Sequence, residues 1–250
     1  DVERMLYMDE HLTSLGILYE RQSAIHGKDY DAGDEYVESL AREKGGHALL
    51  KGELGCALSH KRIYQKMVAE HIPYALVLED DMELTPNFAS IVADEVARKN
   101  KKWEYLLFDY RAVGIPAIRA WVSSVLVNWN TMKQRKLFFR VHFMLYTVLK
   151  GFYLIPLYMF EGLRNTYKKR NPGPVKFYRP LYLAGAYLVS LEGAKKLLKL
   201  SEPVVYTADK LPNQARVKVG LAFYAYAPLS ARQQKEVFGS SILGLRGDQL

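Results

Sequence analysis

The sequence contains one cysteine, Cys56, among its 250 residues. A single thiol excludes an internal disulfide framework and fits a chain that folds in a reducing compartment. The first residues, Asp-Val-Glu-Arg, also lack the basic, apolar and small-residue segments of an export signal. These two absences predict a cytoplasmic protein.

Internal repeats and low-complexity segments are missing as well. A content of 49% hydrophobic and 25% charged residues is the balance of an ordinary globular protein, which excludes a disordered or collagen-like chain. Because a single core can grow to about 250–300 residues, we expect one large α/β domain that carries an insertion.

Acidic residues are nearly absent from residues 119–170. This segment holds ten Lys or Arg residues and one acid, Glu161, so its charge is +9, against +8 for the whole chain. The other residues are therefore close to neutral. The excess of positive charge belongs to one insertion-like segment.

Outside this segment, helical and strand patterns alternate. Apolar residues recur at helical spacing over 57–71, and Pro73 prevents that helix from continuing. Thr85 and Pro86 predict the start of a second helix, and Ser190 predicts the cap of a third over 191–200. The predicted strands are 15–25, after a helix that Gly16 stops, then 74–78, 103–108, 181–189 and 219–227, with 28–53 as a loop. This order predicts βα units and a mainly parallel central sheet.

The predicted strand 74–78 ends in three consecutive acids, Glu79, Asp80 and Asp81. Ligands bind outside the carboxyl ends of strands in parallel sheets. Neighbouring carboxylates repel one another, so a fold that collects them supplies a cation, solvent or a proton. Their hard oxygen atoms suit Mg²⁺ or Mn²⁺, which also bind substrate phosphates. A solvated acidic turn at the end of a strand is the alternative.

Two longer motifs carry a resemblance to a known family. They are Gly52-Glu53-Leu54-Gly55-Cys56-Ala57-Leu58-Ser59-His60 and the apolar strand that ends in Glu79-Asp80-Asp81. Together they resemble glycosyltransferase family 25, a group of sugar transferases of lipooligosaccharide biosynthesis. Shorter matches lie at 3–4, 16–17, 24–27, 103–107, 185–190 and 241–242. The resemblance covers residues 1–110 and 178–245.

The resemblance implies a GT-A-like nucleotide-sugar-binding fold and transfer with inversion from UDP-galactose or UDP-glucose. It also implies a lipooligosaccharide or lipopolysaccharide acceptor in a Gram-negative bacterium, and no nucleic acid partner. The chemistry agrees, because a Mn²⁺ or Mg²⁺ ion between carboxylates and phosphates would neutralise the diphosphate leaving group. GT-A enzymes often use a downstream histidine as a ligand, and none follows His142, so a weak or dispensable metal is expected.

Roles for single residues follow by analogy. Asp80 and Asp81 would hold the metal, and Glu79 would approach the ribose or the sugar. Further donor contacts are expected from Arg4, Ser59, His60, Asp80, Gly185 and Tyr187. A surface position is the alternative for Arg4, and a structural histidine that caps its helix is the alternative for His60. Cys56 is expected to be a small buried residue and not a nucleophile.

Inversion in one displacement also needs a base on the opposite face of the sugar. Asp209 matches a family position where an aspartate follows a strand, and with Glu79 it completes the catalytic candidates. A third metal ligand and a plain turn residue are the other roles open to Asp209. Asp109 is the reserve candidate for the base.

The insertion contains a nearly continuous apolar stretch, residues 141–160, long enough at ~1.5 Å per residue to cross a hydrocarbon core of ~30 Å. Lys150 at its centre and Pro156 argue against a transmembrane span. The flanking basic and aromatic residues favour an interfacial segment on anionic lipid, at the cytoplasmic face of the inner membrane. A helical subdomain that forms its own core, or a homodimer interface, is the alternative.

These observations divide the chain into a donor-binding half, 1–112, a basic aromatic helical insertion, 113–178, and an acceptor-side half, 179–250. A metal-dependent phosphotransferase or nuclease would also need clustered carboxylates, but the basic residues here lie in an aromatic segment. A non-catalytic module that binds anionic lipid would leave the acidic triplet without a role. The resemblance to glycosyltransferase family 25 instead implies a UDP-sugar-dependent hexosyltransferase.

Overall fold

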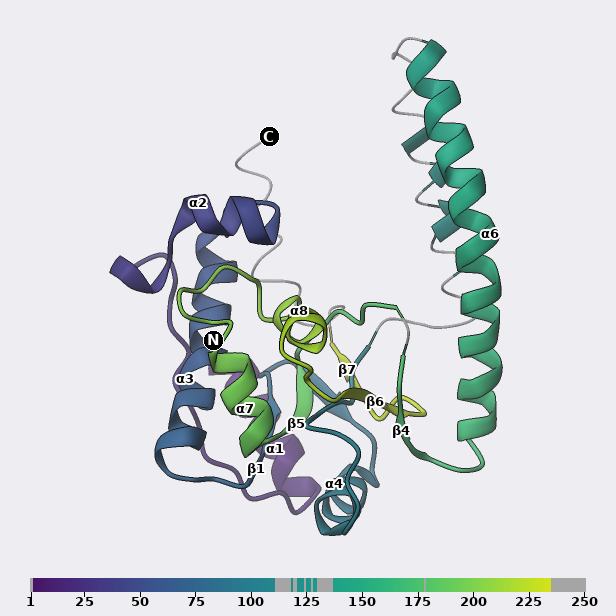
Figure 1. Ribbon diagram of the computed structural model, residues 1–250. Helices are drawn as coiled ribbons and strands as arrows, with labels where there is room; N and C mark the ends of the chain where they lie inside the picture. The colour runs from purple at the N-terminus through teal and green to yellow at the C-terminus, as the bar shows by residue number, and fades with distance from the viewer. Residues whose placement is uncertain are drawn as a thin grey trace. The chain divides into compact units, whose positions relative to one another are not determined.

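The computed structural model describes residues 2–110, 118, 121–123, 125–126, 128–129, 137–177 and 179–234. The chain divides into two compact units. We call them the sheet unit, Asp1–Tyr110 with Pro174–Leu250, and the helical unit, Arg111–Gly173. Figure 1 shows their elements.

A five-stranded sheet with the order β1-β5-β3-β6-β4 forms the centre of the sheet unit. In this order the strands are β1 (Tyr74–Leu78), β5 (Ala186–Ser190), β3 (Tyr105–Leu107), β6 (Phe223–Ala227) and β4 (Gly173–Val175). Strand β5 is antiparallel to both β1 and β3, whereas β3 and β6 are parallel. A separate antiparallel pair consists of β2 (Met82–Leu84) and β7 (Ala231–Gln233).

The prediction of a mainly parallel sheet is therefore wrong for β5, and the sheet is mixed. Strands β1, β3 and β6 point the same way, and β5 runs against them. The apolar pattern of 181–189 fits a strand of either direction, because burial on both faces leaves no directional signal. The long insertion before β5 also removes the short crossover connection that constrains a parallel neighbour.

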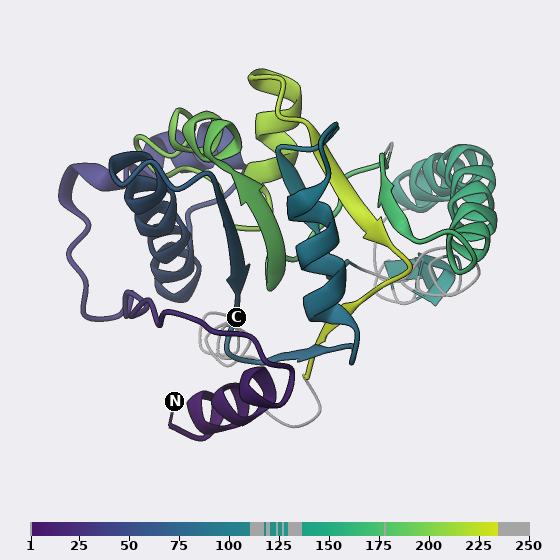
Figure 2. The same cartoon turned by 90° about the horizontal axis from the view of Figure 1, so that it is seen from below.

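Helices cover both faces of the sheet (Figure 2). Successive strand residues point to opposite faces. Leu106 and Leu188 share one core with Met8 of α1 (Val2–Ser14) and Phe88 of α4 (Phe88–Ala97). On the other face, the Tyr187 hydroxyl meets that of Tyr64 in α3 (Lys51–Ala69), 3.0 Å away. Helix α3 packs against α7 (Leu191–Leu198), which contacts α8 (Leu211–Lys218).

Several element boundaries differ from the prediction. Helix α3 begins at Lys51, six residues before the predicted start, because the Glu53 carboxylate accepts the Leu50 amide at 3.0 Å and caps the first turn. The predicted loop 28–53 therefore ends in this helix, and it also contains the short helical elements η1 (Gly33–Glu35), α2 (Glu38–Leu40) and η2 (Ala41–Gly45).

Residues 15–25 form no strand, so that prediction is wrong. Gly16, with a φ of 66°, does stop the preceding helix, as predicted. The N-cap of α4 is Asn87, not Thr85. The Ser190 cap is confirmed, since its hydroxyl accepts the Gly193 amide at 3.1 Å.

The helical unit contains α6 (Leu137–Lys168), which agrees with the predicted helical character of the insertion. The indole of Trp121 packs against Gly151, and the Arg140 guanidinium lies 5.0 Å from the centre of the Trp129 ring. Among the described helices, Phe138–Arg164 is long and apolar enough to cross a membrane, by length and composition alone. Very little of this stretch is buried.

Candidate active site

The acidic triplet lies where β1 leaves the sheet. The Glu79 amide donates to the Gly185 carbonyl at 2.7 Å, which joins the end of β1 to the start of β5. The Asp81 carbonyl accepts the Gln234 amide at 2.9 Å. The three carboxylates are thus fixed by backbone contacts to segments that lie more than 100 residues later in the chain.

Arg4 of α1 is the basic residue that faces the triplet. Its Nη1 lies 3.4 Å from Asp80 Oδ1 and 3.7 Å from Asp81 Oδ2. The side chain is buried, so the alternative of a surface arginine is excluded. Arg4 therefore places a positive charge beside Asp80 and Asp81, and its contact with the donor stays a prediction.

Asp81 is a buried acid with two other negative charges nearby. It is only 7% exposed. Burial, together with repulsion by Glu79 and Asp80, raises its pKa to about 6 despite the attraction of Arg4. Its Oδ1 is buried without a hydrogen-bond partner among the described residues. A buried carboxylate oxygen without a donor fits a divalent cation, so the residues present suit Mn²⁺ or Mg²⁺.

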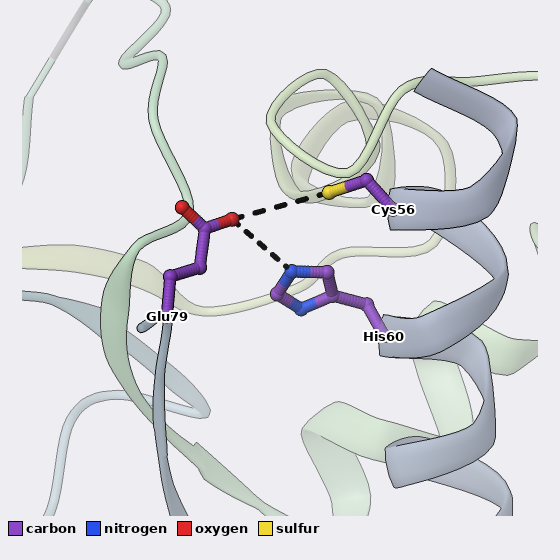
Figure 3. A group of neighbouring side chains, drawn as sticks. All are labelled: Cys56, His60 and Glu79. Carbon is purple, nitrogen blue, oxygen red and sulfur yellow. Dashed lines mark hydrogen bonds and ion pairs between the residues drawn. The ribbon is translucent and has the colours of Figure 1, made fainter. Parts of the chain in front are cut away.

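Glu79 faces a different set of partners (Figure 3). Its Oε1 lies 3.6 Å from His60 Nε2 and 3.9 Å from Cys56 Sγ, and its Oε2 accepts from Gln233 Nε2 at 3.0 Å. Burial alone would raise the pKa of Glu79, but the hydrogen bond and charge of His60 and the Gln233 amide outweigh it and lower the pKa. Glu79 is thus an ionised anchor that holds a proton poorly.

His60 is oriented by two tyrosines. Its Nδ1 lies 2.7 Å from the Tyr187 hydroxyl, which in turn lies 3.0 Å from the Tyr64 hydroxyl. Because α3 begins at Lys51, His60 lies inside the helix and cannot cap it, which excludes that alternative. Tyr187 is 0% exposed and has no surface that could touch a bound donor in this structure. Its hydroxyl directs the other ring nitrogen of His60 toward Glu79.

Cys56, His60 and Glu79 form the one group of three possible metal ligands found among the described residues, with ligand atoms within 4.8 Å of one another. A thiol, an imidazole and a carboxylate suit Zn²⁺ better than Mn²⁺ or Mg²⁺. However, burial and the charges of Glu79 and Asp209 raise the pKa of the Cys56 thiol well above its usual range. The thiol therefore stays protonated, and Cys56 is half-buried, not fully buried as expected.

Gly185 and Asp109 fix the start of β5. The Asp109 carboxylate accepts the amides of Gly185 at 3.2 Å and Ala186 at 3.0 Å. Burial raises the pKa of Asp109 to about 7. The negative charge of Glu79 also raises it, whereas the hydrogen bond from the Ala186 amide lowers it. Because Asp109 is buried and engaged by the backbone, the structure makes it a positioning residue, although it was the reserve candidate for the base.

Gly185 lies in close contact with this acidic region. A Cβ at this position would lie 2.5 Å from the sulfur of Met82 and 3.0 Å from a carboxylate oxygen of Asp109. It would also lie 3.4 Å from Glu79 Oε2. Only glycine leaves room for this approach, so Gly185 shapes the base of the site.

Ser59 joins α3 to residues 25–27, which precede this helix in the chain. Its hydroxyl accepts the Ile25 amide at 2.8 Å and donates to the Gly55 carbonyl at 2.7 Å. A Cβ on Gly55 would lie 2.5 Å from the Ile25 carbonyl oxygen, so this segment packs directly on the helix backbone. The Gly55 and Ser59 positions of the motif thus have a structural role, and donor contact by Ser59 stays a prediction.

Asp209 lies just before α8 and is half-buried, with its carboxylate accepting from the Thr207 hydroxyl. Its charge contributes to the raised pKa of the Cys56 thiol, so it acts on the same cluster as Glu79. Its assignment as the base stays a prediction. Sequence reasoning missed Gln233, which binds Glu79 from β7; a single glutamine in a polar tail gives no signal.

Fold and geometry together define a mixed α/β protein with an acidic site at the end of a central strand and a basic residue facing it. The family described as "Glycosyltransferase family 25 (LPS biosynthesis protein)" matches residues 1–212. The chain therefore belongs to glycosyltransferase family 25.

Similar curated proteins come from animals. A "Glycosyltransferase 25 family member" of Anopheles gambiae is 33% identical over 116 residues, which cover 42% of this chain and 19% of that protein. Its Aedes aegypti counterpart is 32% identical over 114 residues, with the same shares. The "Inactive glycosyltransferase 25 family member 3" of Mus musculus is 46% identical over 43 residues, 17% of this chain and 7% of that protein. The match thus spans less than a fifth of each relative's length.

Proposed function

We propose that the protein transfers a hexose, galactose or glucose, from a UDP-sugar to a lipooligosaccharide or lipopolysaccharide acceptor, with inversion and with help from Mn²⁺ or Mg²⁺. Membership of glycosyltransferase family 25 supports sugar transfer. The description of that family as an LPS biosynthesis protein supports the choice of acceptor. A phosphotransferase or nuclease would have no support from this family.

The observation that carries the proposal is the buried Oδ1 of Asp81, which lacks a hydrogen-bond partner among the described residues. Asp80 and Asp81 would hold the metal ion, which would neutralise the diphosphate of the donor. Arg4 adds a second positive charge within 4 Å of both carboxylates. Together these groups would stabilise the negative charge that develops on the leaving UDP.

Asp209 is proposed as the base. It would accept the proton of the acceptor hydroxyl while that oxygen forms the new bond to the anomeric carbon. The bond from this carbon to the phosphate oxygen would break, and its electron pair would leave with UDP. Glu79 suits this step less well, because its carboxylate already faces His60 and accepts from Gln233. We assign Glu79 to holding His60 and Gln233 in place.

The test is a panel of UDP- and GDP-sugars with purified protein, in Mn²⁺, in Mg²⁺ and in chelator. We expect thermal stabilisation and slow UDP release with one UDP-hexose, and loss of both in chelator. Full turnover in chelator would overturn the role of the metal.

Stabilisation by a UDP-hexose without any UDP release, even with acceptor sugars present, would favour a different function. The protein would then bind the donor without transferring it. The mouse relative named as inactive makes this outcome a specific second candidate.

A further inference from the structure

Helix α6 exposes far more apolar surface than the sheet unit does. Among the described residues, 23 large hydrophobic side chains are exposed, and 15 of them lie on α6. The other exposed residues among those described on this helix are His142, Lys150 and Pro156. Contiguous apolar surface of this extent marks a site that contacts another molecule or a membrane.

The charged residues of α6 lie on one side of the helix. At about 100° per residue they fall within a sector of about 120°. They are Arg140, Lys150, Glu161, Arg164 and Lys168. About two-thirds of the circumference carries no Asp, Glu, Lys or Arg. Its exposed apolar residues, which we call the charge-free arc, are Phe138, Val141, Met144, Leu145, Val148, Leu149, Phe152, Tyr153, Ile155, Met159, Phe160, Leu163 and Tyr167.

Trp121 and Trp129 of the helical unit pack on a side of α6 that lies outside the charge-free arc. Gly151, against which Trp121 packs, lies outside the charge-free arc, as does Arg140, which lies over Trp129. The part of the unit that the structure describes therefore leaves the charge-free arc open to its surroundings. The arc extends over residues 138–167, about 45 Å at ~1.5 Å per residue.

Basic side chains border the arc and continue beyond the helix. Lys150 lies 5.3 Å from the ring centre of Tyr146, and Arg164 lies 5.5 Å from that of Phe160. Long basic side chains beside aromatic rings at the edge of an apolar surface are typical of a membrane interface, where the charged group reaches lipid phosphate. Lys169 and Arg170 follow the helix end, so six basic residues oppose Glu161 over 137–170.

We propose that α6 lies in the plane of an anionic bilayer surface, with the charge-free arc among the acyl chains and the basic residues against lipid phosphates. A transmembrane orientation would place Lys150 near the bilayer centre, which is unfavourable. The charged residues of α6 lie on one side along the whole helix and not only at its ends, which fits the in-plane orientation. The inference goes beyond the transfer reaction, since it needs neither a donor nor turnover.

The direct test is flotation of the purified chain with vesicles. One set contains phosphatidylcholine alone, and the other contains phosphatidylglycerol at a third of the lipid. We expect the chain to float with the anionic vesicles and to bind neutral vesicles at least about tenfold more weakly, with binding that falls as salt rises. Equal binding to both sets, or none to either, would overturn the proposal.

Two variants test the charge-free arc and the basic residues separately. Phe152→Asp places a charge in the middle of the arc, and we expect it to weaken binding at least about tenfold. The control is Val217→Asp in α8, since Val217 and Phe152 are both 77% exposed. This control should bind like the parent. The triple variant Lys168→Gln, Lys169→Gln, Arg170→Gln should lose about a hundredfold, at about fivefold per residue.

Circular dichroism of each variant separates loss of binding from loss of fold. Parent-like binding by folded Phe152→Asp would overturn the role of the arc. Two further measurements distinguish other occupants. Resistance of the bound chain to alkaline carbonate would show a transmembrane helix instead, and a lipid-free dimer that Phe152→Asp dissociates would show that a second copy covers the arc. Failure of UDP-sugar turnover would leave these outcomes unchanged.

Discussion

The two units of this chain place the same kinds of residue in opposite environments. In the sheet unit, aromatic side chains such as Phe88, Tyr105 and Tyr187 are fully buried. In the helical unit, Phe138 and Phe152 are each about three-quarters exposed. The difference cannot be read from hydrophobic content, because both units are rich in aromatic residues. It shows that the sheet unit completes its own core, whereas α6 leaves its large apolar side chains exposed.

Charge follows the same division. The sheet unit buries Arg4, Asp81 and Asp109, and each has an electrostatic or hydrogen-bonding neighbour that changes its behaviour. Among the described residues of the helical unit, Lys150, Lys169 and Arg170 are exposed. Substitutions in the sheet unit should therefore have large effects that depend on named partners, and those on the arc of α6 should have small effects in water.

The largest effect is expected from Asp81→Asn. This change leaves Asp80 as the one carboxylate of the proposed metal pair, so sugar transfer should fall at least about a thousandfold. Relief of repulsion from Glu79 and Asp80 should leave the metal-free protein as stable as the parent or more so. UDP release and thermal unfolding measure the two quantities.

The control for this variant is Asp34→Asn, which changes an exposed acid outside the site. It should keep parent-like activity. Turnover that survives in Asp81→Asn would remove Asp81 from the proposed mechanism.

The next effect concerns pH and Asp109. Its folded pKa of about 7 lies above the ordinary value of 3.8, so the folded state binds this proton more tightly than the unfolded state does. The contribution of Asp109 to the free energy of unfolding is thus largest below pH 4 and is lost as pH rises to about 7. Relative to Asp109→Asn, the parent should lose about 2–3 kcal/mol between pH 4.5 and 8. Urea titrations of both proteins across this range measure the difference, and parallel pH profiles would contradict it.

A smaller effect should distinguish Tyr187 from Tyr105, two buried and stacked tyrosines whose ring centres lie 4.5 Å apart. Tyr187→Phe removes the hydroxyl that meets His60 and Tyr64, and should lower the free energy of unfolding by about 1–2 kcal/mol. Tyr105→Phe is the matched control, because its hydroxyl is buried without a hydrogen-bond partner among the described residues. That change should be neutral or stabilising. Equal losses in both variants would show that packing, and not the hydroxyl, accounts for the effect.

The smallest effect is expected on α6. Leu163 is 68% exposed, so Leu163→Ser should change lipid-free stability by no more than about 0.5 kcal/mol. Leu197 of α7 is fully buried, and Leu197→Ser should lower stability by at least about 2 kcal/mol. Chemical denaturation without lipid or detergent measures both. A large loss in Leu163→Ser would mean that protein covers the arc and would weaken the contrast between the units.

Much of this site could be predicted because its signals are local. An apolar run that ends in three acids places Glu79, Asp80 and Asp81 at a strand end, and Ser190 caps its helix through contacts within a few residues. The direction of β5 could not be predicted in this way, since it depends on pairing between segments separated by more than 80 residues. For the same reason nothing in the neighbouring sequence indicates that Gln233 binds Glu79, or that Tyr187 is fully buried. Hydrogen bonds to distant partners decide those positions, and no local pattern encodes them.

The place of β5 in the sheet also bears on how the chain assembles. Strands β1 and β3 both pair with β5, and residues 111–173 are made after β3 and before β5. During synthesis, the ribosome therefore releases the apolar α6 before the strand that joins the two earlier ones exists. For that interval the Glu79 amide lacks the Gly185 carbonyl that accepts it, and β1 and β3 lack the strand that lies between them, because residues 185–190 have not yet been made. A growing chain in this state would meet a lipid surface through α6 before its acidic site had formed.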